Sequence, residues 1–316
     1  MEQQAIWAIG IFLVIYALII SEKVHRTIVA MIGGLIMVAL GIVDQETALH
    51  HIDFNTLGLL IGMMIIVSIT ADTGLFKFIA VWSAKKSKGN PVSILIALSL
   101  ITAVGSALLD NVTTVLLMVP VTFSITRQLR VSPMPFLITQ IISSNVGGTA
   151  TLIGDPPNIM IGSAVKELTF IAFINNLAPI AAVIMVVFIP IFILLFRNQI
   201  QTTPKLTQSI MDLNEKELIA DHKLLRKCLS VLGLTILGFF LHQSLHLESA
   251  TVALVGAFVL LLLTGEHMME EAFTKVEWTT IFFFVGLFVL VSGLIETGVI
   301  AKLAAQAIEL TNRSEE

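Results

Sequence analysis

The chain has 316 residues, of which 56% are hydrophobic and 13% charged, and its formal net charge is −4. With a mean hydropathy of +0.95, it carries more apolar surface than a soluble fold of this length can bury. The single cysteine, Cys228, excludes an intrachain disulfide and argues against a thiolate metal site. We therefore predict an all-α polytopic membrane protein that has the lipid bilayer, and no nucleic acid, as a partner.

Several long apolar segments are predicted to be membrane helices because they are nearly free of charged residues. They cover residues 5–20, 27–43, 54–71, 177–196, 229–241, 251–264 and 278–295. The first segment follows Glu2 without a basic leader or a convincing cleavage site, so we expect a retained helix rather than a signal peptide. Two further apolar stretches, 92–126 and 136–165, are interrupted by polar residues.

Lysine and arginine residues predict the orientation, because they favour short cytoplasmic loops. Most of the 18 lie in loops that can share one side, at residues 23–26, 77–88, 127–130, 197–227 and 275. The residues that fall on the other side are Lys166, Lys302 and Arg313. We therefore expect a multi-pass protein of the plasma membrane with its N-terminus outside. Residues 91–128 must then enter and leave on the cytoplasmic side, either as two full spans or as a re-entrant hairpin.

The first interruption, residues 110–114, places an acid at membrane depth. No other ionisable residue lies between Lys88 and Arg127. Isolated burial of a carboxylate costs several kcal/mol, so Asp110 should be protonated, paired, hydrated or bound to a cation. Asp110 therefore predicts a site for Na⁺ or H⁺. The alternative is an aspartate at a wet turn between two complete helices.

The second interruption, residues 143–158, has the composition of a helix broken inside the bilayer. Gly147-Gly148 tolerates unusual backbone dihedrals, and Pro156-Pro157 suits the first turn of a helix. Such a break exposes backbone N–H and C=O groups that can bind a solute. Asp155 stands where an N-cap would. It either caps this half-helix or faces the solute.

An internal repeat becomes visible when the chain is shifted on itself by 224 residues. Asp72-Thr73-Gly74 then falls on Glu296-Thr297-Gly298, and Gly62 falls on Gly286. An odd number of predicted crossings separates the two copies, so the repeats should be inverted. Inverted repeats with interrupted helices are typical of secondary transporters.

The strings at residues 108–117 and 145–158 resemble the ion transporter superfamily. Within it, the chain is most similar to the branch that contains the melanosomal P protein, arsenite permeases, sodium-proton antiporters and citrate-transporter-like permeases. This resemblance implies a scaffold domain and a transport domain in each protomer, a homodimer, and an elevator-type movement. It also implies that 91–128 is a re-entrant hairpin, whose tip Asp110-Asn111-Val112 corresponds to the Ser-Asn-Thr tip of sodium-dicarboxylate relatives.

The predicted organisation follows from the repeat and the resemblance. The first repeat covers 1–196, with scaffold helices within 5–73, the hairpin at 91–128, a broken helix at 133–165 and a helix at 177–196. A cytoplasmic linker covers 197–227, and the inverted second repeat starts at 228 and continues to 316. The counterparts of Asp110 and Asn158 at the same offset fall beyond Glu316. We therefore expect a C-terminally truncated second repeat, with a second chain supplying the missing segment.

Two sets of candidate site residues surround the interruptions. The cation-site candidates are Asp110, Asn111, Thr113, Ser144, Asn145, Gly147 and Gly148. The substrate-site candidates are Asn111, Val112, Thr149, Thr151, Asp155 and Asn158. We expect no cofactor, no metal beyond Na⁺ at Asp110, and Na⁺ or H⁺ as the coupling ion.

Two departures from the family pattern affect the expected substrate. Asp110 replaces the tip serine, which favours a cation, and Val112 replaces the tip threonine through which relatives bind dicarboxylates. The interruptions contain no Lys or Arg, so an anion would be held by helix N-termini, hydroxyls and Asn side chains.

Three functional classes are compatible with these features. The favoured one is an ion-coupled secondary transporter, for a small anion such as arsenite, citrate or a dicarboxylate, or for Na⁺ against H⁺. A passive anion channel could use the same scaffold, and a truncated chain could fail to transport. An enzyme is not expected. An intramembrane aspartyl protease would pair Asp110 with Asp155, but the sequence lacks the usual Tyr-Asp and Gly-x-Gly-Asp contexts.

Overall fold

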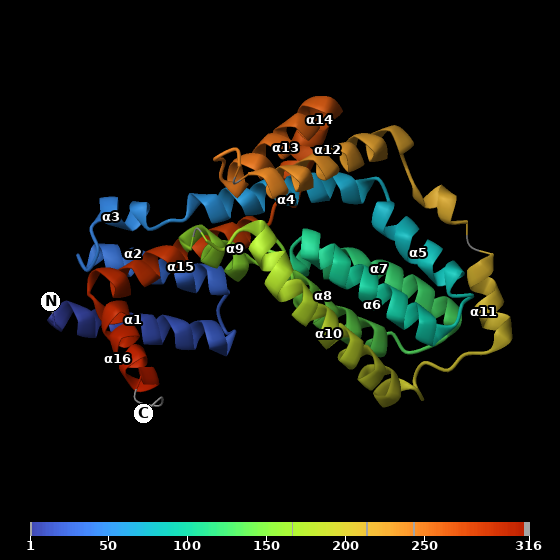
Figure 1. Cartoon of the computed structure of the whole chain (residues 1–316), viewed down its shortest axis with the longest axis horizontal. Helices are drawn as coiled ribbons and strands as arrows, with labels where there is room; N and C mark the ends of the chain where they lie inside the picture. Colours follow the sequence, from blue (N-terminus) through green and yellow to red (C-terminus); the bar gives the residue numbers. More distant parts are fainter. Residues whose placement is uncertain (1, 166, 213, 243, 313–316) are drawn as a thin grey trace. The chain divides into compact units, whose positions relative to one another are not determined.

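The computed structural model describes residues 2–165, 167–212, 214–242 and 244–312, and all the regular elements within these residues are helices. Figure 1 labels α1 (Glu2–Ser21), α2 (Arg26–Ala39), α3 (Gln45–His50), α4 (Phe54–Asp72), α5 (Leu75–Lys86), α6 (Pro91–Leu108), α7 (Asn111–Leu129), α8 (Met134–Thr149), α9 (Pro156–Ala164), α10 (Phe170–Phe196), α11 (Pro204–Met211), α12 (His222–Leu241), α13 (Ser249–Thr264), α14 (Glu266–Lys275), α15 (Trp278–Glu296) and α16 (Val299–Asn312). A short 3₁₀ helix covers Glu215–Leu218. Lys166 and Arg313, which entered the predicted orientation, lie outside the described residues.

The helices confirm the predicted polytopic membrane protein. Seven helices in the described part of the chain are long and apolar enough to cross a membrane, namely α1, α4, α6, α7, α10, α12 and α15. Helices α2 and α13 are apolar but shorter, with 14 and 16 residues. Large apolar side chains remain exposed on several of these helices, including Val186 on α10 and Leu262 on α13. Such apolar surfaces are stable in contact with lipid rather than with water.

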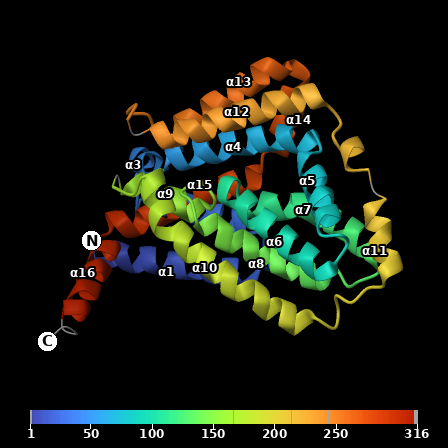
Figure 2. The same cartoon turned by 45° about the vertical axis from the view of Figure 1, so that its right-hand side comes forward.

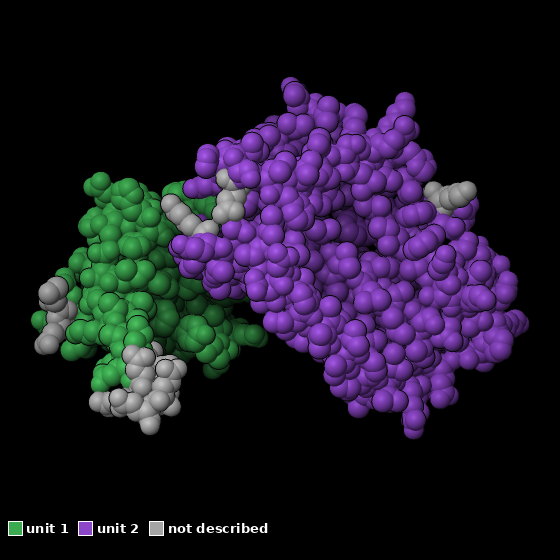
Figure 3. All heavy atoms as spheres, viewed as in Figure 1, with its two compact units in different colours: residues 1–57, 277–316 green, residues 58–276 purple. Residues whose placement is uncertain are grey.

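The chain divides into two compact units, drawn in different colours in Figure 3: residues 1–57 with 277–316, and residues 58–276. In the first unit, α2 packs closely along α15. A Cβ added to Gly286 would lie 2.5 Å from the backbone nitrogen of Met31, so only glycine allows this approach. The Thr27 hydroxyl donates a hydrogen bond to the carbonyl oxygen of Thr279 at 2.8 Å. Ile15 and Met37 are buried in the apolar core of this unit.

In the second unit, α6, α7 and α8 form a bundle that Figure 2 shows from the side of α10. Its core contains Leu95, Leu98, Met118 and Phe136, all less than 2% exposed. Helices α12 and α13 pack together in the same unit, and α4 approaches α13 at Gly62. The bundle positions the two interruptions predicted from the sequence.

Local contacts recur 224 residues apart along the chain. A threonine hydroxyl donates to a carboxylate at Thr56–Asp53 and again at Thr280–Glu277. A hydroxyl donates to a backbone carbonyl at Ser68–Ile65 and Thr73–Thr70, and again at Ser292–Val289 and Thr297–Leu294. Glycines with positive φ recur at Gly41 and Gly265 and at Gly74 and Gly298. These equivalences are local, and the inversion of the repeats stays a prediction.

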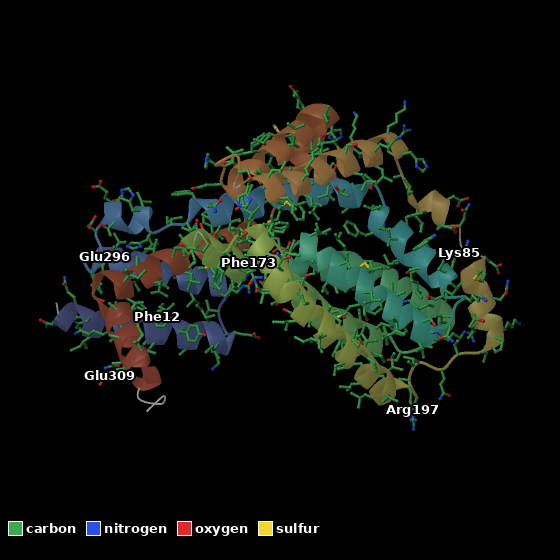
Figure 4. All side chains as sticks on the ribbon, in the orientation of Figure 1. Phe12, Lys85, Phe173, Arg197, Glu296 and Glu309 are labelled. Atoms are coloured by element: carbon green, nitrogen blue, oxygen red, sulfur yellow. The ribbon has the colours of Figure 1, made fainter. Side chains whose placement is uncertain are left out.

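Each unit also contains contacts between residues of the two predicted repeats. The Lys275 ammonium lies 2.6 Å from both carboxylate oxygens of Asp72, and the His51 Nε2 lies 2.8 Å from Glu296 Oε1. His51 and Lys275 are 224 residues apart, as are Asp72 and Glu296. The two ion pairs are therefore equivalent contacts, in which an acid of one repeat meets a base of the other. Figure 4 labels Glu296 at the end of α15.

Two predicted boundaries are wrong. Helix α10 begins at Phe170 instead of 177, because the Thr169 hydroxyl accepts a hydrogen bond from the Ala172 N–H at 3.0 Å and caps an earlier start. Helix α12 begins at His222, inside the predicted linker 197–227. That linker also contains α11, whose Ile210 is fully buried. The domain assignment as a whole stays a prediction.

Candidate functional site

The first interruption is a sharp turn between α6 and α7. Helix α6 ends at Leu108, Leu109 is extended, and Asp110 is the N-cap of α7. Asp110 Oδ1 accepts a hydrogen bond from the Thr113 N–H at 2.8 Å, which is the normal N-cap interaction. Asp110 Oδ2 has no hydrogen bond to any described residue, so half of this partly buried carboxylate remains available.

The second interruption is a non-helical segment between α8 and α9. Helix α8 ends at Thr149, and α9 begins only at Pro156. The Thr151 hydroxyl donates to the Ala107 carbonyl at 2.5 Å and accepts from the Gly154 N–H at 3.1 Å. These bonds fix the segment against the end of α6. The predicted helix break is therefore present in the structure.

Asn158 holds the break in shape from the first turn of α9. Its side-chain Nδ2 lies 2.9 Å from the Thr151 carbonyl, 3.3 Å from that of Thr149 and 3.4 Å from that of Gly148. Carbonyls at the end of α8 lack partners within the helix. One amide group therefore stabilises carbonyls that the break leaves free.

Three glycines allow the broken segment to approach α6. A Cβ on Gly147 would lie 2.6 Å from the Ala103 Cα and carbonyl carbon, and one on Gly154 would lie 2.6 Å from the Ser106 carbonyl oxygen. A Cβ on Gly148 would lie 2.7 Å from the Gly154 carbonyl oxygen. Real Cβ atoms are almost never closer than 3.0 Å to such atoms. The glycines are therefore required by space, and none of the three has a positive φ.

The two interruptions lie close together in the second unit. The Asn111 amide donates to the Asn145 side-chain oxygen at 3.1 Å, which joins the tip of the hairpin to α8. The Thr151–Ala107 hydrogen bond holds the break against the end of α6, so Asp110 and Asp155 each lie within four residues of that contact in the sequence. Two acids and two asparagines from separate segments therefore converge, and this is the geometry of the candidate site.

The other predicted residues have different roles. Thr113 contributes its backbone N–H, Val112 is 47% exposed, and the Thr149 hydroxyl donates to the Asn145 carbonyl. The Ser144 hydroxyl bonds within α8, to the Ile141 carbonyl at 2.8 Å. The hydroxyls of Thr149 and Ser144 are therefore bonded to backbone carbonyls of α8.

Asp155 occupies the N-cap position of α9 but makes no capping hydrogen bond with its side chain. The interpretation of Asp155 as a helix cap is therefore wrong in this geometry. Pro156 and Pro157 have no N–H to donate, and the N–H of Asn158, which is the counterpart of the Thr113 N–H at Asp110, is already bonded to backbone. The backbone carbonyl of Asp155 accepts from Asn158 instead, at 3.0 Å.

Sequence reasoning did not assign Ser106, whose hydroxyl donates to the Ser144 carbonyl at 2.7 Å. It is fully buried and joins α6 to α8 beside the break. Its position near the end of α6, four residues before Asp110 in the sequence, is the signal that could have identified it. Gly154, within the second interruption, was also not assigned to the site.

The site is not a preformed transition-metal centre. Among the residues whose placement is described, no group of three or more His, Cys, Asp or Glu could hold a metal ion. Cys228 is buried on α12, away from both interruptions along the chain. The pair of carboxylates at Asp110 and Asp155 suits a proton or a small hard cation with oxygen ligands.

Comparisons with known proteins agree with this architecture. The family model described as "Citrate transporter" matches residues 16–313. An uncharacterized transporter of Mycobacterium tuberculosis is 44% identical, over 98% of this chain and 73% of that protein. A 46 kDa membrane protein of Mycobacterium leprae is 41% identical, over 98% and 72%. The human P protein is 35% identical, over 93% of this chain and 44% of its own length.

These names indicate a transporter rather than an enzyme, and the helices place it in a membrane with several passes. The chain belongs to the citrate transporter family of the ion transporter superfamily.

Proposed function

We propose that this membrane transporter is an ion-coupled secondary transporter, which moves a small anion or exchanges Na⁺ for H⁺. The observation that carries the proposal is the convergence of the α6–α7 tip with the α8–α9 break. The Asn111–Asn145 and Thr151–Ala107 hydrogen bonds join them, which brings together the segments that carry Asp110 and Asp155. Two carboxylates at one site favour a bound cation or a shared proton.

Asp110 is the main ligand of the coupling ion in this proposal. One oxygen is used to cap α7, and the other oxygen has no hydrogen bond within the described chain. Asp155 also lacks a side-chain hydrogen bond to described residues. Carboxylate oxygens, backbone carbonyls and the Asn side chains together offer the hard ligands that Na⁺ accepts, and protonation of the pair gives an alternative neutral state.

The substrate would be a small anion of the arsenite, citrate or dicarboxylate kind. It would be bound without a cationic side chain, since the interruptions contain neither Lys nor Arg. Helix α7 begins at the first interruption, so its N-terminal N–H groups and the Asn and Thr groups nearby are the available donors, whereas the first two residues of α9 are prolines without an N–H. Citrate is suggested only by the family name.

Inverted repeats and an elevator-type movement complete the proposal. The recurrence of hydrogen bonds, positive-φ glycines and ion pairs at 224-residue separation supports the repeats. Alternating access in such proteins moves one structural unit against another. We propose a homodimer in the plasma membrane with the N-terminus outside, as the sequence predicts.

Transport by the purified protein in vesicles tests the coupling, with Na⁺ and H⁺ gradients imposed separately. Replacing Asp110 by Asn retains a good N-cap but removes the charge. We expect Asp110→Asn to abolish the dependence on the coupling ion. Asp44→Asn is the matched control, because Asp44 caps α3 through Thr47 in the same way, at 3.0 Å. Unchanged Na⁺ and pH dependence in Asp110→Asn would refute the assignment.

The same vesicles separate a carrier from a passive anion channel. A carrier accumulates solute against its gradient when only an ion gradient is imposed, whereas a channel cannot. Flux that follows voltage alone and ignores both ion gradients would favour the channel. Thermal stabilisation by Na⁺, Li⁺, arsenite, citrate and succinate at several pH values identifies the ligand, because a ligand stabilises the state that binds it.

A further inference from the structure

Buried hydroxyl groups in the α6–α8 bundle normally bond to a carbonyl of their own helix. Thr102 donates to Leu98 at 2.7 Å, and Thr139 donates to Pro135 at 2.6 Å. Two serines are exceptions. Ser99 and Ser143 are fully buried, yet their hydroxyl oxygens have no hydrogen-bond partner among the described residues. A buried hydroxyl without a partner is costly, so each requires an explanation.

The helix register places these two serines opposite each other. Contacts between α6 and α8 recur at a separation of 44 residues, because Ala103 meets Gly147 and Ala107 accepts the Thr151 hydrogen bond. One helical turn back along both helices gives Ser99 and Ser143. They do not bond to each other.

Gln140 provides a third polar group on the same face of α8. It lies one turn before Ser143 and is 1% exposed. Its Oε1 shares the single hydroxyl hydrogen of Thr122 on α7 with the Met118 carbonyl, at 3.0 and 2.9 Å, whereas its Nε2 has no partner within the described chain. Three unsatisfied polar groups are therefore buried within about one helical turn of each other along the packed faces of α6 and α8.

We propose that Ser99, Ser143 and Gln140 bind one buried water molecule, which joins α6 to α8 and, through Gln140 and Thr122, to α7. A buried water usually makes about three hydrogen bonds, which is the number of groups available here. It can accept from the amide N–H and one hydroxyl and donate to the other hydroxyl. The site is distinct from the Asp110 site and does not depend on the proposed transport function.

A monovalent cation is a poorer occupant. The amide Nε2 presents protons to the site, and a cation requires oxygen ligands. Helix α8 has no acid, and Asp110 beyond the end of α6 is the only acid near that helix in sequence. A desolvated cation without a counter-charge is unfavourable. Water satisfies all three groups at no cost in charge.

The sign of a stability change tests the proposal. If water bridges the groups, Ser99→Ala and Ser143→Ala each remove one of its partners, and the melting temperature should fall by roughly 2–4 °C. If the hydroxyls are simply unsatisfied, each substitution removes a buried penalty and should leave the melting temperature unchanged or raise it. Ser83→Ala is the control, since Ser83 is buried on α5 and bonds to the Ala80 carbonyl.

Two further measurements complete the test on the full-length protein. The melting temperature of the double variant Ser99→Ala/Ser143→Ala should fall by less than the sum of the two single decreases, because one water couples the two serines. The decreases in melting temperature should be the same in Na⁺, K⁺ and choline buffers. The bridging water would be overturned if the serine substitutions left the melting temperature unchanged or raised it, or if the two decreases were additive. It would also be overturned, in favour of a cation, if the decreases appeared only in Na⁺.

Discussion

Gly147 packs directly against the backbone of α6, and replacing it by alanine gives a sharp test of the candidate site. The added Cβ would lie 2.6 Å from two backbone atoms of Ala103 and closer still to the carbonyl oxygen. Backbone cannot rotate away as a flexible side chain can. The two helices must therefore separate beside the helix break.

The expected magnitude combines two opposite effects. Overpacking a close contact costs about 1–3 kcal/mol. Replacing glycine by alanine inside a helix recovers roughly 0.5–1 kcal/mol. The net loss should be about 1–2 kcal/mol, which corresponds to a fall in melting temperature of roughly 2–8 °C for a unit of this size. Ligand stabilisation should fall as well, because Asn145 and its bond to Asn111 lie on the same turn of α8.

Thermal unfolding of the purified protein at one scan rate measures the effect, with and without the stabilising ion. Gly233→Ala is a matched control, because Gly233 also lies inside a helix of the second unit but has no atom within 4 Å of the added Cβ. We expect Gly233→Ala to be neutral or stabilising. Equal behaviour of the two variants would show that the Ala103 contact does not constrain the helices.

The remaining predictions concern the break and the ion pairs. Asn158→Asp replaces a donor to three carbonyls by an acceptor and should cost about 1–3 kcal/mol, whereas Asn176→Asp on α10 should cost less in the same melting assay. Lys275→Gln breaks the ion pair with Asp72. Both side chains are about one third exposed, so the free energy of unfolding should fall by only about 0.2–1 kcal/mol, and by less at high salt. Burial lowers the pKa of Lys275, but hydrogen bonds and attraction to Asp72 and Glu271 raise it by more, so the net pKa lies above the ordinary value for lysine. The contribution of Lys275 should therefore be complete at neutral pH and disappear only as the pH rises through that raised value; a loss already at pH 8 would contradict this.

The positions of the two interruptions could be predicted because their residues have strong local preferences. The polar residues at 110–114 within an apolar stretch predict an interruption, and α6 does end at Leu108, just before Asp110. Gly147-Gly148 and Pro156-Pro157 predict a break, and the helix stops between them. Such signals depend on a few neighbouring residues, so no tertiary information is needed.

The roles of individual side chains could not be predicted in the same way. Asp155 has the expected position for a cap, but whether it caps depends on the N–H groups that the two prolines remove. Ser106 becomes part of the site only because α8 brings the Ser144 carbonyl to it. The start of α10 at Phe170 was missed because the polar Asn175 and Asn176 interrupt the apolar pattern, while the Thr169 cap outweighs them.

The packing of α2 on α15 also has a consequence for biogenesis. The Thr27–Thr279 hydrogen bond joins residues 252 positions apart, so α2 is synthesised long before its partner exists. At 5–20 residues per second the delay is roughly 12–50 s. During that time the glycine face of α2 must be held by lipid or by the insertion machinery. Slowing translation within the intervening segment should therefore increase degradation of the nascent protein more than slowing it after α15.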